Sequence, residues 1–128
     1  MKFDKDRVLL LYKYLIESTG GVFGIRDDSL LESAIETPYQ TFSGNELFPT
    51  KFEKVAQLGY GLISNHPFID GNKRIGFFIM LSFLEVNGIS IKFINEEIKK
   101  IAYFIAAGNL SYEELLNILI EKNNKTLT

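Results

Sequence analysis

The stretch NKRIGFFIMLSFLEV, residues 72–86, decides the fold of this protein. After a polar first turn it is apolar on almost every side, which is typical of a helix that lies in the centre of a domain and is covered by the other helices. Its longest apolar block, residues 75–84, is too short to cross a bilayer. The stretch therefore predicts a buried central helix that ends at Asn87 and Gly88.

The composition of the chain is that of a single globular domain. It has 128 residues, of which 46% are hydrophobic, and it contains no cysteine, which excludes disulfides and thiolate metal sites. A formal net charge of −2 leaves no strongly basic surface, so direct binding to nucleic acid is not expected. Because the N-terminus lacks a small-residue cleavage site, we expect a cytoplasmic protein without a membrane partner.

Periodicity and capping residues predict five further helices. Val8, Tyr12 and Leu15 lie on one helical face, and Thr50 with Glu53 has the spacing of a capping box. The predicted helices cover residues 4–18, 29–36, 51–65, 72–86, 95–107 and 112–121. We expect an all-α fold, with six helices around the buried fourth and one small β-like flap. Residues 1–121 then form a single domain, and residues 122–128 a polar, frayed tail.

The flap is predicted in the least regular stretch, PYQTFSGNELFPT, residues 38–50. Prolines at both ends of the stretch and a Ser-Gly-Asn turn between apolar residues are typical of a short hairpin. The flap comprises Thr41, Phe42, Ser43, Gly44, Asn45, Glu46, Leu47 and Phe48.

A second stretch, SNHPFIDGNKR, residues 64–74, collects polar residues at the start of the central helix. The predicted first turn consists of Gly71, Asn72, Lys73 and Arg74. Its backbone N–H groups lack intrahelical partners and carry the positive end of the helix dipole, so such a turn binds phosphate. Glycine allows close approach, and the two cations add charged donors. The pattern predicts a cradle for a polyphosphate.

Asp70 and His66 complete the predicted site. A carboxylate beside a phosphate cradle repels the anion unless a cation lies between them, and Mg²⁺ is commonly held by one or two carboxylates plus phosphate oxygens. His66 is the only histidine of the chain, and an imidazole, which titrates near pH ~6.5, can take a proton from a hydroxyl. A base, a magnesium ligand and a phosphate-binding turn are the parts of phosphoryl or nucleotidyl transfer.

Each of these residues also has a simpler interpretation when taken alone. A lone histidine in a loop is more often incidental than catalytic, Asp70-Gly71 makes a good turn and Asn72 a good cap. Lys73 and Arg74 are compatible with a solvated face. Chance is a poor explanation of the joint pattern, because all of these polar groups lie at one helix N-terminus.

The stretch HPFIDGNKR, residues 66–74, resembles the signature of the Fic family, His-Pro-Phe-x-Asp/Glu-Gly-Asn-Gly/Lys-Arg. Its Asn-Lys-Arg ending is similar to the Doc branch, the death-on-curing toxins of bacterial toxin–antitoxin pairs. The order of GGVFGIRD, SLLESAIETPYQTFSGNELFP and FLEVNG, through residues 20–88, is also similar to Doc-type sequences. The resemblance implies a Fic-like fold.

The resemblance implies a role for each matching residue. His66 is the implied general base and Asp70 the implied Mg²⁺ ligand, with ATP as co-substrate. Pro67 and Phe68 match positions that shape the loop, and the flap at 41–48 is implied to align a target segment by strand-like pairing. The implied anion-binding turn comprises Gly71, Asn72, Lys73 and Arg74.

Two positions differ from the Fic enzymes that transfer AMP, which commonly have a second glycine and a second arginine there. Lys73 and Phe77 occupy these positions, and both match the Doc branch, a protein kinase that inactivates elongation factor Tu. A lysine adds bulk and charge to the cradle and could reverse the nucleotide, so that its γ-phosphate faces the acceptor. Doc-type sequences often have Thr-Ala where this chain has Ile75-Gly76, and Gly76 weakens the helix slightly.

Three functions are weighed against one another. The first is a Doc-like toxin that transfers phosphate from ATP to a Ser or Thr hydroxyl of a translation factor, elongation factor Tu by resemblance, and so arrests translation. The alternative is AMP transfer to a protein hydroxyl, against which Lys73 and the missing second arginine speak. The second alternative is a non-catalytic binding module on the same fold. Nothing in the sequence supports it, because no residue of the motif is missing.

Restraint of this activity is expected from a second chain. Fic proteins that inhibit themselves carry a helix with the pattern Ser/Thr-x-x-x-Glu-Gly/Asn, and no Ser or Thr of this sequence is followed by Glu four residues later. The resemblance therefore implies a Phd-like antitoxin, supplied in trans, that folds a helix against the domain near Arg74.

Overall fold

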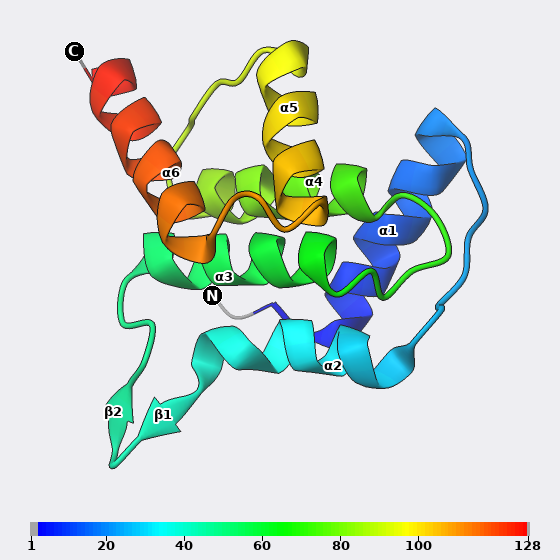
Figure 1. Cartoon of the computed structure of the whole chain (residues 1–128), viewed down its shortest axis with the longest axis horizontal. Helices are drawn as coiled ribbons and strands as arrows, with labels where there is room; N and C mark the ends of the chain where they lie inside the picture. The colour runs from blue at the N-terminus through cyan, green and yellow to red at the C-terminus, as the bar shows by residue number, and fades with distance from the viewer. Residues whose placement is uncertain (1–2, 128) are drawn as a thin grey trace.

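The computed structural model describes residues 3–127, and it confirms the all-α fold with one small flap (Figure 1). None of the helices within these residues combines the length and the apolar character that crossing a bilayer requires. The elements are α1 (Lys5–Thr19), α2 (Asp28–Glu36), the 3₁₀ turn η1 (Thr37–Tyr39), β1 (Thr41–Phe42), β2 (Asn45–Glu46), α3 (Lys51–Ser64), α4 (Asn72–Val86), α5 (Asn95–Ala106) and α6 (Tyr112–Leu127).

Helix α4 is buried as its sequence predicts, and it shares the centre of the molecule with α3. Ile75, Ile79 and Leu84 of α4 are completely buried. Helix α4 contacts α1, α3 and α5, while α3 contacts α2, α4, α5, α6 and η1. Figure 1 shows α3 and α4 side by side across the middle of the molecule. The core is thus built on the pair of helices α3 and α4.

Two glycines allow α3 and α4 to approach each other closely. A Cβ atom added to Gly76 would lie 2.5 Å from Ile63 Cγ1 and 3.1 Å from the backbone oxygen of Gly59. A Cβ atom added to Gly59 would overlap the side chain of Met80. The helix propensity lost at Gly76 is therefore offset by tight packing between the two central helices.

Side-chain caps begin most of the helices, and the cap predicted at Thr50 is among them. Asp27 Oδ1 accepts a hydrogen bond of 3.0 Å from Leu30 N, which lowers the pKa of the Asp27 carboxyl. Both hydrogen bonds of a capping box are present at Thr50 with Glu53. The same pair of bonds joins Ser111 and Glu114 at the start of α6.

The flap is a short antiparallel hairpin in which Thr41 pairs with Glu46 and Phe42 with Asn45. Its two turn residues, Ser43 and Gly44, have φ angles of 52° and 80°, as a two-residue hairpin turn requires. The hairpin is attached to the start of α3, where Lys54 Nζ lies 2.9 Å from Glu46 Oε1.

The C-terminal segment differs from the prediction of a frayed tail over residues 122–128. Helix α6 continues through Leu127, and residue 128 lies outside the described residues. Lys122 Nζ lies 2.6 Å from Glu97 Oε2 of α5 and 5.2 Å from the centre of the Phe93 ring. Because these partners are distant in sequence, the polar composition of this segment does not reveal the contacts that support its helix.

Candidate active site

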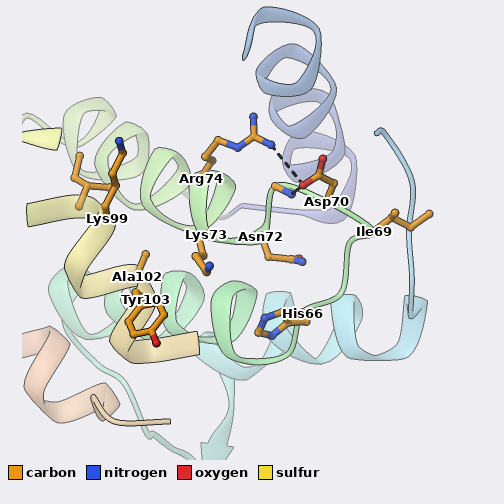
Figure 2. Close-up of a pocket in the computed structure, with 11 residues that line it drawn as sticks. His66, Ile69, Asp70, Asn72, Lys73, Arg74, Lys99, Ala102 and Tyr103 are labelled. Atoms are coloured by element: carbon orange, nitrogen blue, oxygen red, sulfur yellow. Dashed lines mark hydrogen bonds and ion pairs between the residues drawn. The ribbon is translucent and has the colours of Figure 1, made fainter. Parts of the chain in front are cut away.

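A pocket of about 550 Å³ lies between the start of α4, the loop that precedes it and one face of α5 (Figure 2). We call residues 65–71 the site loop. The pocket brings together all six residues predicted from the motif: His66, Asp70, Gly71, Asn72, Lys73 and Arg74. The rest of the lining was not predicted; it consists of Ile69, Ile98, Lys99, Ala102 and Tyr103. Four of these residues belong to α5, and no motif in the sequence marks them.

His66 lies two residues beyond the end of α3, in a backbone conformation that is unusual for a residue with a side chain. Its φ angle is 49°, in the left-handed region. Its ring nitrogen Nδ1 lies 3.3 Å from the backbone oxygen of Ser64. When the proton is on Nδ1, the ring donates to Ser64 and leaves the lone pair of Nε2 available to accept a proton.

The start of α4 has the geometry that the predicted phosphate cradle requires. Gly71 is the N-cap residue with a φ angle of 83°, a conformation that favours glycine, and no side chain caps this helix. The backbone N–H groups of the first turn therefore lack a side-chain acceptor and remain available to an anion.

The side chain of Asn72 forms hydrogen bonds to the backbone of the site loop. Its Oδ1 accepts from Phe68 N at 2.9 Å, and its Nδ2 donates to Phe68 O at 3.0 Å. The residue is only 9% exposed. The amide thus closes the site loop onto the first turn of α4, and the part of Asn72 that remains for the predicted anion-binding role is its backbone N–H.

Lys73 and Arg74 point in different directions (Figure 2). Lys73 is exposed, and its Nζ lies 5.9 Å from the centre of the Tyr103 ring across the pocket. Arg74 Nη1 donates to Thr19 Oγ1 at 2.6 Å and to Gly20 O at 2.8 Å, at the end of α1. Lys73 is therefore the more available cation, while Arg74 also ties α1 to the site.

Asp70 is oriented by the backbone around it. Its Oδ1 accepts from Gly71 N at 2.8 Å and lies 3.7 Å from Arg74 Nη2, and its Oδ2 accepts from Val22 N at 3.1 Å. An ionised carboxylate has about four lone-pair sites, so both oxygens retain capacity for a cation. Within residues 3–127, no three His, Asp or Glu side chains gather as a metal-binding group. A Mg²⁺ ion held by Asp70 would therefore need further oxygen ligands from a bound phosphate and water.

Helix α1 and the loop between α1 and α2 support the site loop. The Tyr12 hydroxyl donates to Asp70 O at 2.8 Å, and its ring stacks on Phe68 with the ring centres 3.8 Å apart. Ile69 N donates to Gly24 O at 2.9 Å. Arg26 donates to the backbone of Asn65 and His66. The loop at 21–27 therefore holds the site loop in place through hydrogen bonds to its backbone and to Asp70.

The flap is not part of this pocket. It precedes α3, whereas His66 follows the other end of that helix, and the 14 residues of α3 span about 21 Å. Figure 1 accordingly shows the hairpin and the start of α4 at opposite ends of α3. The docking role of residues 41–48 stays a prediction.

Comparison with known proteins identifies the family of this chain. The sequence model of the Fic/DOC family matches residues 2–84, which include the site loop and most of α4. Toxin Doc of Mycolicibacterium smegmatis is 36% identical over 72 residues, which cover 56% of this chain and 55% of that protein. This chain thus matches little more than half the length of that curated relative. Since the family match covers well over half of this chain, the chain belongs to the Fic/DOC family.

Proposed function

We propose that this protein is a Doc-like toxin that transfers the γ-phosphate of ATP to a Ser or Thr hydroxyl of a translation factor and so arrests translation. Elongation factor Tu is the target that the resemblance implies. The observation that carries the proposal is the gathering of His66, Asp70 and the uncapped start of α4 around one pocket. The similarity to Toxin Doc supports the toxin class.

In the proposed reaction His66 acts as the general base. The acceptor oxygen forms a bond to the γ-phosphorus while its proton passes to His66 Nε2. The bond between the γ-phosphorus and the β,γ-bridging oxygen breaks, and ADP leaves. The first-turn N–H groups of α4 and the Lys73 ammonium bind the phosphate oxygens and stabilise the charge that they carry.

The chemistry of Asp70 fits a magnesium ion. Asp70 would hold Mg²⁺ together with the phosphate oxygens of ATP, where the ion neutralises the charge between carboxylate and phosphate. Arg74 of α4 and Val22 N of the α1–α2 loop keep the carboxylate in place.

Phosphate transfer is favoured over AMP transfer by the surroundings of Phe77 and Lys73. Phe77 is 2% exposed and its ring packs edge-on against Phe93, with the ring centres 5.7 Å apart. An apolar core side chain thus occupies the position where AMP-transferring relatives commonly have a second arginine. Lys73 instead places its charge at the pocket.

Intact-protein mass spectrometry of purified elongation factor Tu after incubation with this protein, ATP and Mg²⁺ tests the proposal. We expect a phosphate adduct that needs Mg²⁺ and that forms far more slowly with His66→Ala. An AMP adduct would instead establish the alternative chemistry. If elongation factor Tu carries no adduct, the same assay is repeated with the other purified translation factors, and no adduct on any of them would support the non-catalytic binding module. If Lys73 selects the orientation of the nucleotide, Lys73→Gly shifts the product from phosphate towards AMP.

We further propose that a Phd-like antitoxin in trans restrains this cytoplasmic activity near Arg74. Expression of the chain alone in bacterial cells from a tightly controlled promoter should arrest growth, and coexpression of the neighbouring gene should restore it. Normal growth with soluble wild-type protein confirmed would overturn the toxin proposal.

A further inference from the structure

Arg26 lies outside the pocket lining but contacts the backbone of the proposed base. Its Nε donates to the backbone oxygen of His66 at 2.6 Å, and its Nη2 donates to the backbone oxygen of Asn65 at 2.9 Å. The two partners are separated from Arg26 by 40 and 39 residues in the sequence. One guanidinium group thus connects the loop before α2 with the segment that follows α3.

The backbone of His66 needs such support, because its conformation is unfavourable. A φ angle of 49° is rare for a residue with a Cβ atom and persists where surrounding contacts enforce it. The imidazole itself has one polar contact within the described residues, the 3.3 Å approach of Nδ1 to Ser64 O. The orientation of the imidazole at the pocket therefore depends on the backbone of residues 64–66.

Arginine suits this position for two physical reasons. Its planar fork of N–H donors reaches two neighbouring carbonyl oxygens at once, which the single ammonium of lysine does less well. The carbonyls belong to the segment that ends α3, where the negative end of the helix dipole favours a cation. Asn65, one of the two partners, is the C-cap residue of α3.

The rest of the site loop is held by contacts that do not need the Arg26 side chain. Arg26 N and Asp27 N both donate to Pro67 O, at 2.7 and 3.0 Å. Asn65 Nδ2 donates to Leu30 O at 3.1 Å. Removal of the guanidinium therefore leaves the loop docked and loosens His66 selectively.

We propose that Arg26 is a positioning residue that fixes the left-handed backbone of His66 and thereby directs Nε2 toward the acceptor hydroxyl. The inference rests on the proposed role of His66 as the base. It predicts that substitution of Arg26 alters the position of the imidazole, while the fold and the binding of ATP are little affected.

The single histidine makes this inference testable without a transfer assay. In untagged protein labelled with ¹⁵N, every imidazole signal belongs to His66. The wild type should give one set of ring signals with the proton on Nδ1. Arg26→Gln should broaden or split that set, Arg26→Lys should do so less, and Arg7→Gln, which removes an exposed guanidinium from α1, should leave it unchanged.

The kinetic test separates positioning from a purely structural role. Arg26→Gln should lower kcat for phosphate transfer by about 10²-fold, the cost typical of a misplaced catalytic group, while the KM for ATP stays close to the wild-type value. Arg26→Lys should be less impaired. In Arg26→Ala, guanidinium ions far below denaturing concentrations should restore part of kcat and sharpen the His66 signals.

Two results would overturn the inference: unchanged His66 signals in folded Arg26→Gln, or losses in kcat that only follow a loss of folded protein. If Arg26→Gln does not fold, Arg26→Lys decides by the same measurements. A wild type without transfer activity would count against the proposed function, whereas the ring signals would still confirm or reject the contact between Arg26 and His66.

Discussion

The site loop and the flap are both short irregular segments beside α3, but they are built in opposite ways. Phe68 of the site loop is 1% exposed and is enclosed by Tyr12 and by the amide of Asn72. In the flap, Phe42 is 72% exposed and Leu47 49% exposed. Hydrogen bonds from α4 and the α1–α2 loop hold the site loop, whereas the flap rests on a two-residue pairing and on its attachment to α3.

This difference matches the two tasks proposed for the segments. Catalytic groups need fixed positions, because misplacement by about 1 Å can cost a large factor in rate. A surface that pairs with a target segment needs accessible backbone and exposed apolar side chains, and it can become ordered on binding. The comparison therefore predicts that substitutions in the two segments affect different steps of the same reaction.

The largest effect is expected from His66→Ala, which removes the proposed base from the rigid segment. Transfer should fall by about 10²–10⁴-fold, the range that general base catalysis contributes. The thermal midpoint should stay close to that of the wild type, since the imidazole is only half-buried. Phosphate incorporation and thermal unfolding, measured on the same preparation, check both statements. Transfer at the wild-type rate would remove His66 from the mechanism.

The next effect concerns the helix pair that carries the site loop. Gly76→Ala should lower the free energy of unfolding by about 1–3 kcal/mol, because the added methyl group meets Ile63 Cγ1 at 2.5 Å. Denaturant unfolding measures the loss. In the double variant with Ile63→Ala the methyl group regains space, so the combined loss should be smaller than the sum of the two single losses. Simple additivity would show that close packing is not the reason for glycine at this position.

A smaller and more selective effect is expected from the flap. Phe42→Asp and Leu47→Asp should each weaken target docking by about 1–2 kcal/mol and raise KM for the protein target, while ATP binding and the thermal midpoint stay unchanged. Phe48→Asp serves as the contrasting variant, because the Phe48 ring packs against Tyr112, with the ring centres 5.4 Å apart, and should lose stability as well. Equal losses of target modification and ATP binding in the first two variants would contradict a docking role.

The smallest effect is expected at the cap of α2, which follows Arg26. The Leu30 N–H lowers the pKa of Asp27 below 3.8, so the stabilisation from this carboxylate is present above pH 3.8 and is lost as the pH falls through the lower folded-state pKa. Asp27→Asn keeps a cap oxygen but does not titrate. The thermal midpoint of the variant should therefore fall less steeply than that of the wild type below pH 3.8. Parallel curves would show that Asp27 contributes nothing to acid sensitivity.

Local sequence was sufficient to predict much of the fold and the set of residues at the candidate site. The capping box at Thr50, a hairpin in residues 41–48 and the limits of α4 were all predicted correctly, because each depends on residues within one or two turns. The end of α6 was predicted wrongly, since Lys122 finds its partner on another helix.

The sequence by itself determined which residues are available for chemistry: one histidine, one carboxylate and a glycine-initiated helix in nine residues. Tertiary structure alone decided what those residues do with their hydrogen bonds. In the folded protein the Asn72 amide bonds to Phe68, and Arg74 donates to Thr19. Tyr103 lies opposite Lys73, and Arg26 donates to the backbone of His66. Apart from the bond of Asn72 to Phe68, these contacts join residues that are far apart along the chain. They depend on how the helices pack, and no local pattern of residues encodes that packing.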